Sequence, residues 1–257
     1  PSPLPSQAEG DAHDIDVWRG FCVDAFAHRE SAAETAARKS RHGSYRAMFQ
    51  QRLRLRTDGL YVSRNTYIKP GAKTMENAKC CHLVAYYRYF RFYRTGEFVC
   101  KTSPRRLRDE AKLLKDRAAC ARSNEVCHGG YTIDGEDRVR CEAIRPKSNG
   151  EWSATYFWVR LRQNKPGASN RLDVVKIAMV DGDNDPPTPT DEEWRAVDDE
   201  EALYRRGLGI CAQKFDGTAE VRVANRGLST LVFVPWDEVN VHELNKTTEE
   251  MDFYFTG

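Results

Sequence analysis

The stretch LVAYYRYFRFY, residues 83–93, decides the fold class of this chain. Successive side chains of an extended chain point to opposite faces, and here both faces carry aromatic or aliphatic groups. This pattern predicts a central β-strand with the core on one side and a lid or helix on the other. We expect Arg88 and Arg91 to lie on opposite faces of that strand. The side chains expected to be largely buried are Tyr87, Tyr89, Phe90 and Phe92.

The segments that follow predict antiparallel neighbours for this strand. The dipeptides Thr95-Gly96 and Asp134-Gly135 are typical of hairpin turns. After the second turn apolar and charged residues alternate, as they do in a half-buried antiparallel strand. Further strand candidates are residues 155–162, 171–180, 219–224, 228–234, 239–243 and 252–255.

These strands follow one another without β-α-β alternation, which favours a meandering antiparallel sheet. Closure into a barrel removes the exposed edges of such a sheet. We therefore predict a mainly β protein, a lipocalin-like antiparallel β-barrel of roughly eight to ten strands that starts near residue 53.

Two charged insertions interrupt the strand pattern. In the first, Ser103 and Pro104 predict the start of a basic helix with an apolar stripe at Leu107, Ala111, Leu114 and Ala118. The second, DGDNDPPTPTDEEW at 181–194, is acidic and proline-rich. Its Thr190-x-x-Glu193 pattern predicts a capping box and a helix that ends near Gly207.

The N-terminal part of the chain has a different character. Residues 1–14 are polar and predict a flexible arm, residues 15–50 a helical lead-in, and residues 51–257 the barrel. In the lead-in, apolar residues recur at helical spacing and must pack on the barrel or on a partner. They are Val17, Trp18, Phe21, Cys22 and Phe26. The chain opens with proline and its first methionine is Met48, so we expect a further segment upstream.

The charge and hydropathy of the chain argue against some classes of binding partner, namely nucleic acids and membranes. The formal net charge of +2 gives no reason to expect a nucleic-acid binder. No run of 18 apolar residues is present, so we expect a soluble protein without a membrane span. The eight cysteines are spread along the chain and suggest reduced thiols rather than a disulfide framework.

Metal binding is the alternative use of the cysteines. Zinc-ligand types cluster at Cys80, Cys81 and His82, and again at Cys127 and His128. Adjacent residues alternate across a strand, whereas zinc ligands converge from a turn. We therefore expect neither a metal nor a cofactor.

The sequence assigns no catalytic residues. It contains no nucleophile elbow, phosphate-binding loop or metalloprotease helix, and its six histidines are scattered. A small apolar ligand inside the barrel is a further alternative, with Trp152, Tyr156 and Trp158 as the lining.

Several of these stretches resemble a known family in order and spacing. TDGLYVS at 57–63, followed by TYI at 66–68 and YYRYFRF at 86–92, resembles the C-terminal domain of the F-box only protein 9 family. Upstream, VWR at 17–19 with Cys22 is similar to the last helix of an F-box. YRAMF at 45–49 is similar to the segment that joins the F-box to the barrel.

The resemblance implies a non-catalytic substrate-recognition subunit of a Skp, cullin and F-box ubiquitin ligase, located in the cytoplasm or nucleus. In such an assembly the F-box helices bind the Skp adaptor, which the cullin scaffold carries, and the C-terminal domain binds the protein substrate. Too few residues separate Leu4-Pro5 from Trp18 for a complete F-box. The alternative is therefore a structural subunit that uses the barrel as a docking module.

Candidate binding residues follow from these interpretations. Those of the adaptor or packing helix are Val17, Trp18, Phe21 and Cys22. Those of the partner-binding rim are Arg105, Arg106, Arg108 and Trp194, because loops vary on a fixed scaffold and charged or aromatic side chains dominate interfaces.

Overall fold

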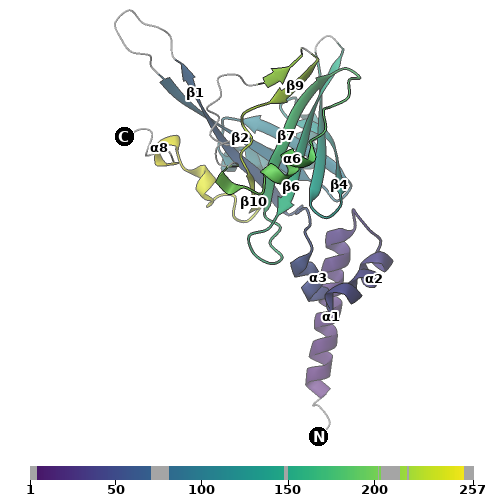
Figure 1. Cartoon of the computed structure of the whole chain (residues 1–257). Helices are drawn as coiled ribbons and strands as arrows, with labels where there is room; N and C mark the ends of the chain where they lie inside the picture. Colours follow the sequence, from purple (N-terminus) through teal and green to yellow (C-terminus); the bar gives the residue numbers. More distant parts are fainter. Residues whose placement is uncertain are drawn as a thin grey trace, which may run out of the picture.

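An antiparallel β-barrel forms the body of the protein (Figure 1). The computed structural model describes residues 5–70, 81–147, 150–201, 203, 215–218 and 220–251. In this part of the chain ten strands form one sheet, and eight of them close into the barrel. They are β1 (Gly59–Pro70), β2 (Cys81–Phe92), β3 (Glu97–Ser103), β4 (Cys127–Asp134), β5 (Arg138–Pro146), β6 (Trp152–Arg162), β7 (Arg171–Asp181) and β10 (Leu231–Pro235).

The strand order confirms the predicted meander and closed barrel. Strands β1 to β7 pair with their sequence neighbours, and β10 closes the barrel between β7 and β1. Two short strands, β8 (Phe215–Gly217) and β9 (Val221–Ala224), widen the sheet beside β7: β9 pairs with the C-terminal part of β7, and β8 pairs with β9. The hairpin turns at Gly96 and Gly135 both have a positive φ, as a tight turn requires.

Strand β2 is covered on both faces, as its sequence predicts. Phe90 and Phe92 point into the barrel, where the Phe90 ring lies 4.8 Å from that of Phe157. Tyr87 and Tyr89 point outward and pack under helix α4 (Leu107–Lys115). All four are buried, which confirms that part of the prediction.

The basic insertion differs from its prediction at both ends. Helix α4 starts at Leu107 rather than Pro104, because Ser103 belongs to β3 and its hydroxyl donates to Glu110 at 2.7 Å. The helix breaks at Asp116, whose carboxylate accepts from two backbone N–H groups and caps the next helix, α5 (Arg117–Arg122). The predicted single helix is therefore two helices.

The acidic insertion contains the predicted capping box. It begins helix α6 (Asp191–Ala196), which ends earlier than expected, and Gly207 lies outside the described residues. The predicted strand 239–243 is wrong: turns lead into the 3-10 helix η1 (Glu243–Asn245), and α8 (Thr248–Met251) follows. The candidate at 252–255 also lies outside the described residues.

Three helices lie at the barrel end where β1 begins (Figure 1). They are α1 (Pro5–Phe26), α2 (Ala32–His42) and α3 (Tyr45–Gln51). Helix α1 begins at Pro5, so residues 5–14 are not the flexible arm that their polar composition predicted. Proline is well suited to the first turn of a helix, and polar residues do not stop one that starts there. No helix in the described residues combines the length and apolar character needed to cross a bilayer.

Buried charge fixes these helices to one another. The Glu30 carboxylate accepts from Arg52 Nη1 at 2.7 Å and from Nη2 at 3.1 Å, and Arg38 Nε lies 2.8 Å away. The Arg52 guanidinium also stacks 4.0 Å from the Phe26 ring. The backbone N–H of Gly167, in the loop between β6 and β7, donates to the Gln50 carbonyl at 2.8 Å and ties α3 to the barrel.

Candidate protein-binding surfaces

The predicted adaptor helix has one packed face and one exposed face. Cys22 is buried against α3, and its thiol donates to the Tyr45 carbonyl at 3.2 Å. Trp18 is half-buried, with its ring 5.6 Å from that of Phe49. Val17 and Phe21, one helical turn apart, are 39% and 51% exposed. The four predicted residues therefore divide into two that anchor α1 and two that present apolar surface to solvent.

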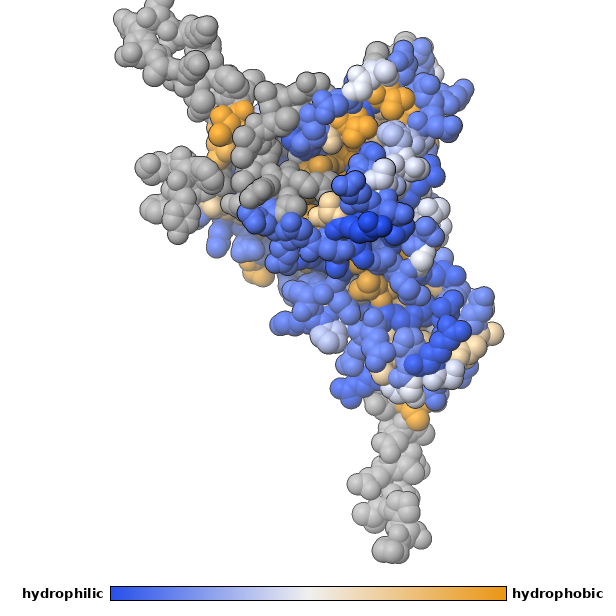
Figure 2. All heavy atoms as spheres, viewed as in Figure 1, coloured by the Kyte–Doolittle hydropathy of each residue, from blue (hydrophilic) through white to orange (hydrophobic). Residues whose placement is uncertain are grey.

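This apolar surface stands out against its surroundings. Ile15 is also exposed, but it lies two residues before Val17 and therefore on another side of α1, so the apolar strip consists of Val17 and Phe21. Figure 2 shows one side of the molecule as largely hydrophilic, with hydrophobic side chains in a few separate places. Exposed apolar side chains that lie together on one helix face are typical of a docking surface.

The four rim residues do not form one surface. Arg105 is exposed and lines a groove at the barrel end opposite the N-terminal helices. Arg106 and Arg108 turn toward η1: Arg106 Nη1 donates to the Asn245 carbonyl at 3.3 Å, and the Arg108 backbone N–H donates to the Asn245 side chain at 2.8 Å.

Trp194 is not a rim residue. It is 8% exposed and anchors the six-residue helix α6 on the outside of the barrel wall, beside Tyr156 and Trp158. A helix this short is held by its apolar side chain, so the tryptophan is required for packing.

The predicted ligand lining is also misplaced. Tyr156 and Trp158 stack on each other at 6.0 Å on the outer face of β6, and Trp152 packs against the same cluster. The residues between and after them, Phe157 and Val159, are the ones that face the interior.

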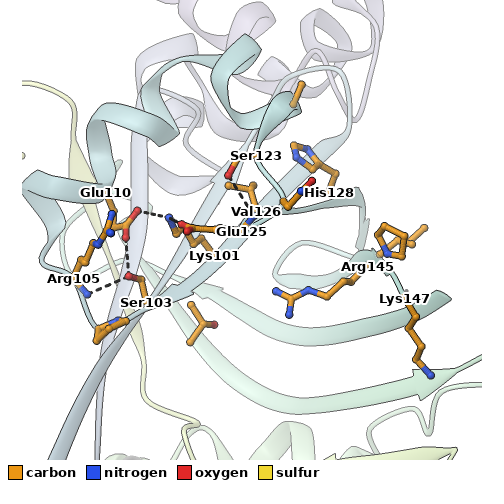
Figure 3. A pocket seen from close by; sticks show the side chains of 16 residues that line it. Lys101, Ser103, Arg105, Glu110, Ser123, Glu125, Val126, His128, Arg145 and Lys147 are labelled. Atoms are coloured by element: carbon orange, nitrogen blue, oxygen red, sulfur yellow. Dashed lines mark hydrogen bonds and ion pairs between the residues drawn. The ribbon is translucent and has the colours of Figure 1, made fainter. Parts of the chain in front are cut away.

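A groove opens where the barrel wall is incomplete, between the ends of β3 and β5 (Figure 3). We refer to this cavity of about 1130 Å³ as the β3–β5 groove. Its charged lining residues are Lys101, Arg105, Glu110, Glu125, Arg145 and Lys147. Of these residues, only Arg105 is predicted from the sequence as a binding residue. The signal that could have found the groove is Lys101, a charge that directly follows the apolar run Phe98–Cys100 of β3.

One wall of the groove is a fixed ion-pair cluster. Lys101 and Glu110 are 4% and 2% exposed, and Lys101 Nζ lies 2.6 Å from a carboxylate oxygen of Glu110. The exposed Glu125 also reaches Lys101 at 2.6 Å. Burial acts to lower the pKa of Lys101, but the two carboxylates outweigh it and raise that pKa. Lys101 is therefore a permanent cation whose charge both glutamates offset.

The opposite wall is cationic. The Arg145 side chain extends from β5 into the groove (Figure 3), and its Nη2 donates to Cys127 Sγ at 3.3 Å. Lys147 pairs with Asp181 at 3.1 Å. Among the described residues, neither Arg105 nor Arg145 has a carboxylate within ion-pair distance. Arg105 is therefore free to bind an anion, whereas Arg145 is shared with the Cys127 thiolate and has only its remaining guanidinium N–H groups to offer to another anion.

The residues considered for zinc make other contacts. Cys127 lies opposite Cys100 in the β3–β4 register, and His128 Nε2 lies 3.0 Å from the Cys120 carbonyl. The part of the chain that the structure describes holds no cluster of three or more His, Cys, Asp or Glu placed to bind a metal. Cys80 lies outside it, as do the side chains of Cys81 and His82.

Cys127 is expected to be an unusually reactive thiol. A hydrogen bond from Cys100 and the nearby Arg145 lower its pKa to about 6, although burial opposes them. The thiolate is therefore populated at pH 7, and iodoacetamide is expected to label Cys127 faster than Cys120, whose pKa burial raises. Labelling of Cys127 should slow as the pH falls through about 6.

Timed labelling with peptide mass spectrometry measures both rates. Arg145→Gln removes one cause of the lowered pKa and should move the midpoint of Cys127 labelling to higher pH. Equal rates for Cys127 and Cys120 at pH 7 would contradict the prediction.

Comparison with known protein families shows what the chain is similar to. The sequence profile of the family described as F-box only protein C-terminal region matches residues 34–257. The matched part includes nearly all of α2, α3 and every strand of the barrel. No solved structure matches the chain.

Proposed function

This chain belongs to the family of F-box only protein C-terminal regions, and from that premise we propose that it is the substrate-recognition subunit of a Skp, cullin and F-box ubiquitin ligase. The observation that carries the proposal is the family match across residues 34–257. The motifs TDGLYVS at 57–63 and YYRYFRF at 86–92 support a closer relation to F-box only protein 9. The division into a helical lead-in, 15–50, and a barrel, 51–257, belongs to the same proposal.

The positions of the two surfaces suit this role. Helix α1 lies at the barrel end where β1 begins (Figure 1), and its exposed face carries Val17 and Phe21. The β3–β5 groove is lined by the later ends of β3 and β5, which run away from that end. Such a chain performs no chemistry itself. It raises the effective concentration of substrate lysines near a ubiquitin-loaded enzyme. A protein of this kind works in the cytoplasm or the nucleus.

Affinity purification of the full-length protein from cells, followed by mass spectrometry, tests the proposal. Recovery of Skp and cullin is the expected result. A stable assembly that lacks both would overturn the proposal and favour a structural subunit that uses the barrel as a docking module.

The exposed face of α1 is expected to contact the adaptor. Val17→Asp combined with Phe21→Asp places two charges where an apolar contact would form, so recovery of Skp should fall at least about tenfold. Quantitative mass spectrometry of the purified complex gives this ratio.

Val241→Asp is the matched control. Val241 is 82% exposed and lies near η1, away from α1. Its replacement should leave Skp recovery within about twofold, since surface substitutions rarely exceed ~0.5 kcal/mol. Unchanged recovery with the Val17 and Phe21 double variant would place the adaptor contact elsewhere.

A further inference from the structure

The β3–β5 groove exists because β4 begins at Cys127, short of the ends of its two neighbours β3 and β5. Strand β3 pairs with β2 as far as Ser103, but with β4 only as far as Cys100. Strand β5 pairs with β6 as far as Pro146, but with β4 only as far as Ile144. The ends of β3 and β5 therefore face each other across the place that a longer β4 would fill.

The chain before β4 leaves this place open. Val126 is buried outside the barrel wall with the residues under α4, and its N–H donates to the Ser123 carbonyl in a turn. A chain that entered this place as a strand would lie ~4.8 Å from β3, the usual spacing of neighbouring strands.

The edge of β3 offers backbone groups for such a chain. Gly96, just before β3, accepts from the Tyr131 N–H of β4. Backbone groups alternate along an antiparallel strand, so Thr102, six residues later, points its N–H and C=O to the same side. This side faces the groove, and Thr102 lines it.

The side chains around this edge select for negative charge. Lys101 is already offset by Glu110 and Glu125, whereas Arg105 and Arg145 have no carboxylate partner among the described residues. Arg145 extends from the β5 wall, and Arg105 lies beside the β3 wall (Figure 3). A carboxylate on either side of a bound chain would meet a guanidinium.

We propose that the β3–β5 groove binds an acidic peptide segment of a partner protein, added as a strand between the ends of β3 and β5. Backbone hydrogen bonds to Thr102 hold the segment, and its carboxylates pair with Arg105 and Arg145. This inference rests on the proposed function only for the identity of the partner, which is then the substrate protein.

Fluorescence anisotropy with the full-length protein tests the proposal. The probe is a labelled ten-residue peptide that alternates glutamate with threonine and valine, compared with the same peptide carrying lysine in place of glutamate. The acidic peptide is expected to bind, and the basic one is expected not to bind. Arg145→Glu should weaken binding at least about tenfold, because it replaces a charge-assisted hydrogen bond by repulsion.

Arg108→Glu is the matched control. It makes the same charge change on an exposed residue of α4 that does not line the groove, and it should alter affinity by less than about twofold. Arg145→Gln removes the charge without reversing it, and circular dichroism of each variant checks the fold. Equal affinities for wild type, Arg145→Gln and Arg145→Glu would overturn the proposal.

A second peptide tests the added strand itself. Methylation of alternate backbone nitrogens removes donors without changing charge, so it should weaken binding if the peptide pairs with β3. Unchanged affinity would overturn strand addition. Heparin binding as tight as that of the peptide would mean an unspecific cationic patch.

The outcome separates this inference from the proposed function. Arg145→Glu is distant from α1 and should leave recovery of Skp and cullin unchanged. If Arg145→Glu loses peptide binding but still recovers Skp, the result supports the groove. If the wild type recovers Skp but binds no acidic peptide, the result overturns the groove proposal alone. Absence of Skp from the wild-type complex overturns the ligase proposal alone.

Discussion

Phe90→Ala is expected to lower the free energy of unfolding by about 3–5 kcal/mol, the usual cost of emptying a large aromatic site in a core. The Phe90 ring lies 4.8 Å from that of Phe157 and 5.0 Å from that of Phe98, inside the closed barrel. Strands joined in a closed sheet cannot move inward easily to fill the space, so the cost should lie at the upper end of that range. Urea unfolding followed by circular dichroism measures it.

Phe21→Ala provides the matched control for this substitution. It removes the same atoms from a ring that is half exposed on α1, so it should cost less than about 1 kcal/mol. Equal losses for the two variants would contradict a core centred on Phe90. The control has a second use, because on the proposed function it should weaken adaptor recovery without unfolding the barrel.

Glu30→Ala is expected to cost about 3–5 kcal/mol, because it leaves the buried guanidinium of Arg52 without its carboxylate. Burial alone would raise the pKa of Glu30, but hydrogen bonds from Arg52 and Thr35 outweigh it and hold that pKa below its usual value. The stabilisation is therefore complete above the pKa of unfolded glutamate, about 4.3, and is lost as the pH falls through the lower folded value.

Thermal unfolding at several pH values tests both statements. The wild type should lose more stability than Glu30→Ala when the pH falls below about 4. Glu136→Ala is the control, since Glu136 also faces Arg52, at 4.0 Å, but is 61% exposed, and its loss should cost less than about 1 kcal/mol. Equal costs for Glu30→Ala and Glu136→Ala would contradict the role of burial.

The spacing of apolar residues predicted the barrel because the sequence of the central strand alone shows that both of its faces are covered. The run at 83–93 has apolar residues at both odd and even positions, which requires cover on both faces wherever the strand lies. The same property made β6 ambiguous. Tyr156, Phe157, Trp158 and Val159 are all apolar, so spacing could not tell which alternate set faces the interior.

Local sequence patterns predicted the wrong secondary structure where contacts in the folded protein opposed them. Ser103 has the chemistry of a helix cap, yet its hydroxyl bonds to the buried Glu110 and β3 continues through it. The alternation around Val241 is typical of a strand, but closure of the barrel by β10 and β1 leaves no free edge beside them for it to pair with. Val241 is correspondingly exposed.

The groove could not be predicted from the sequence. It depends on where β4 stops pairing relative to β3 and β5, and that register is set by pairing in three dimensions. Arg145 and Lys101 come from different strands, and no sequence spacing places them on one cavity.

Closure of the sheet also sets a fixed distance between the two ends of the molecule. An eleven-residue strand such as β6, tilted by about 40°, spans about 28 Å along the barrel axis. An extended segment of about ten residues reaches ~35 Å. On the proposed function, and with an acidic segment of the substrate bound in the β3–β5 groove, a barrel of this length sets a minimum spacing between that segment and the lysine that is modified. It would favour substrates whose acceptor lysine lies about ten residues or more from the acidic segment, and a lysine beside that segment would stay out of reach.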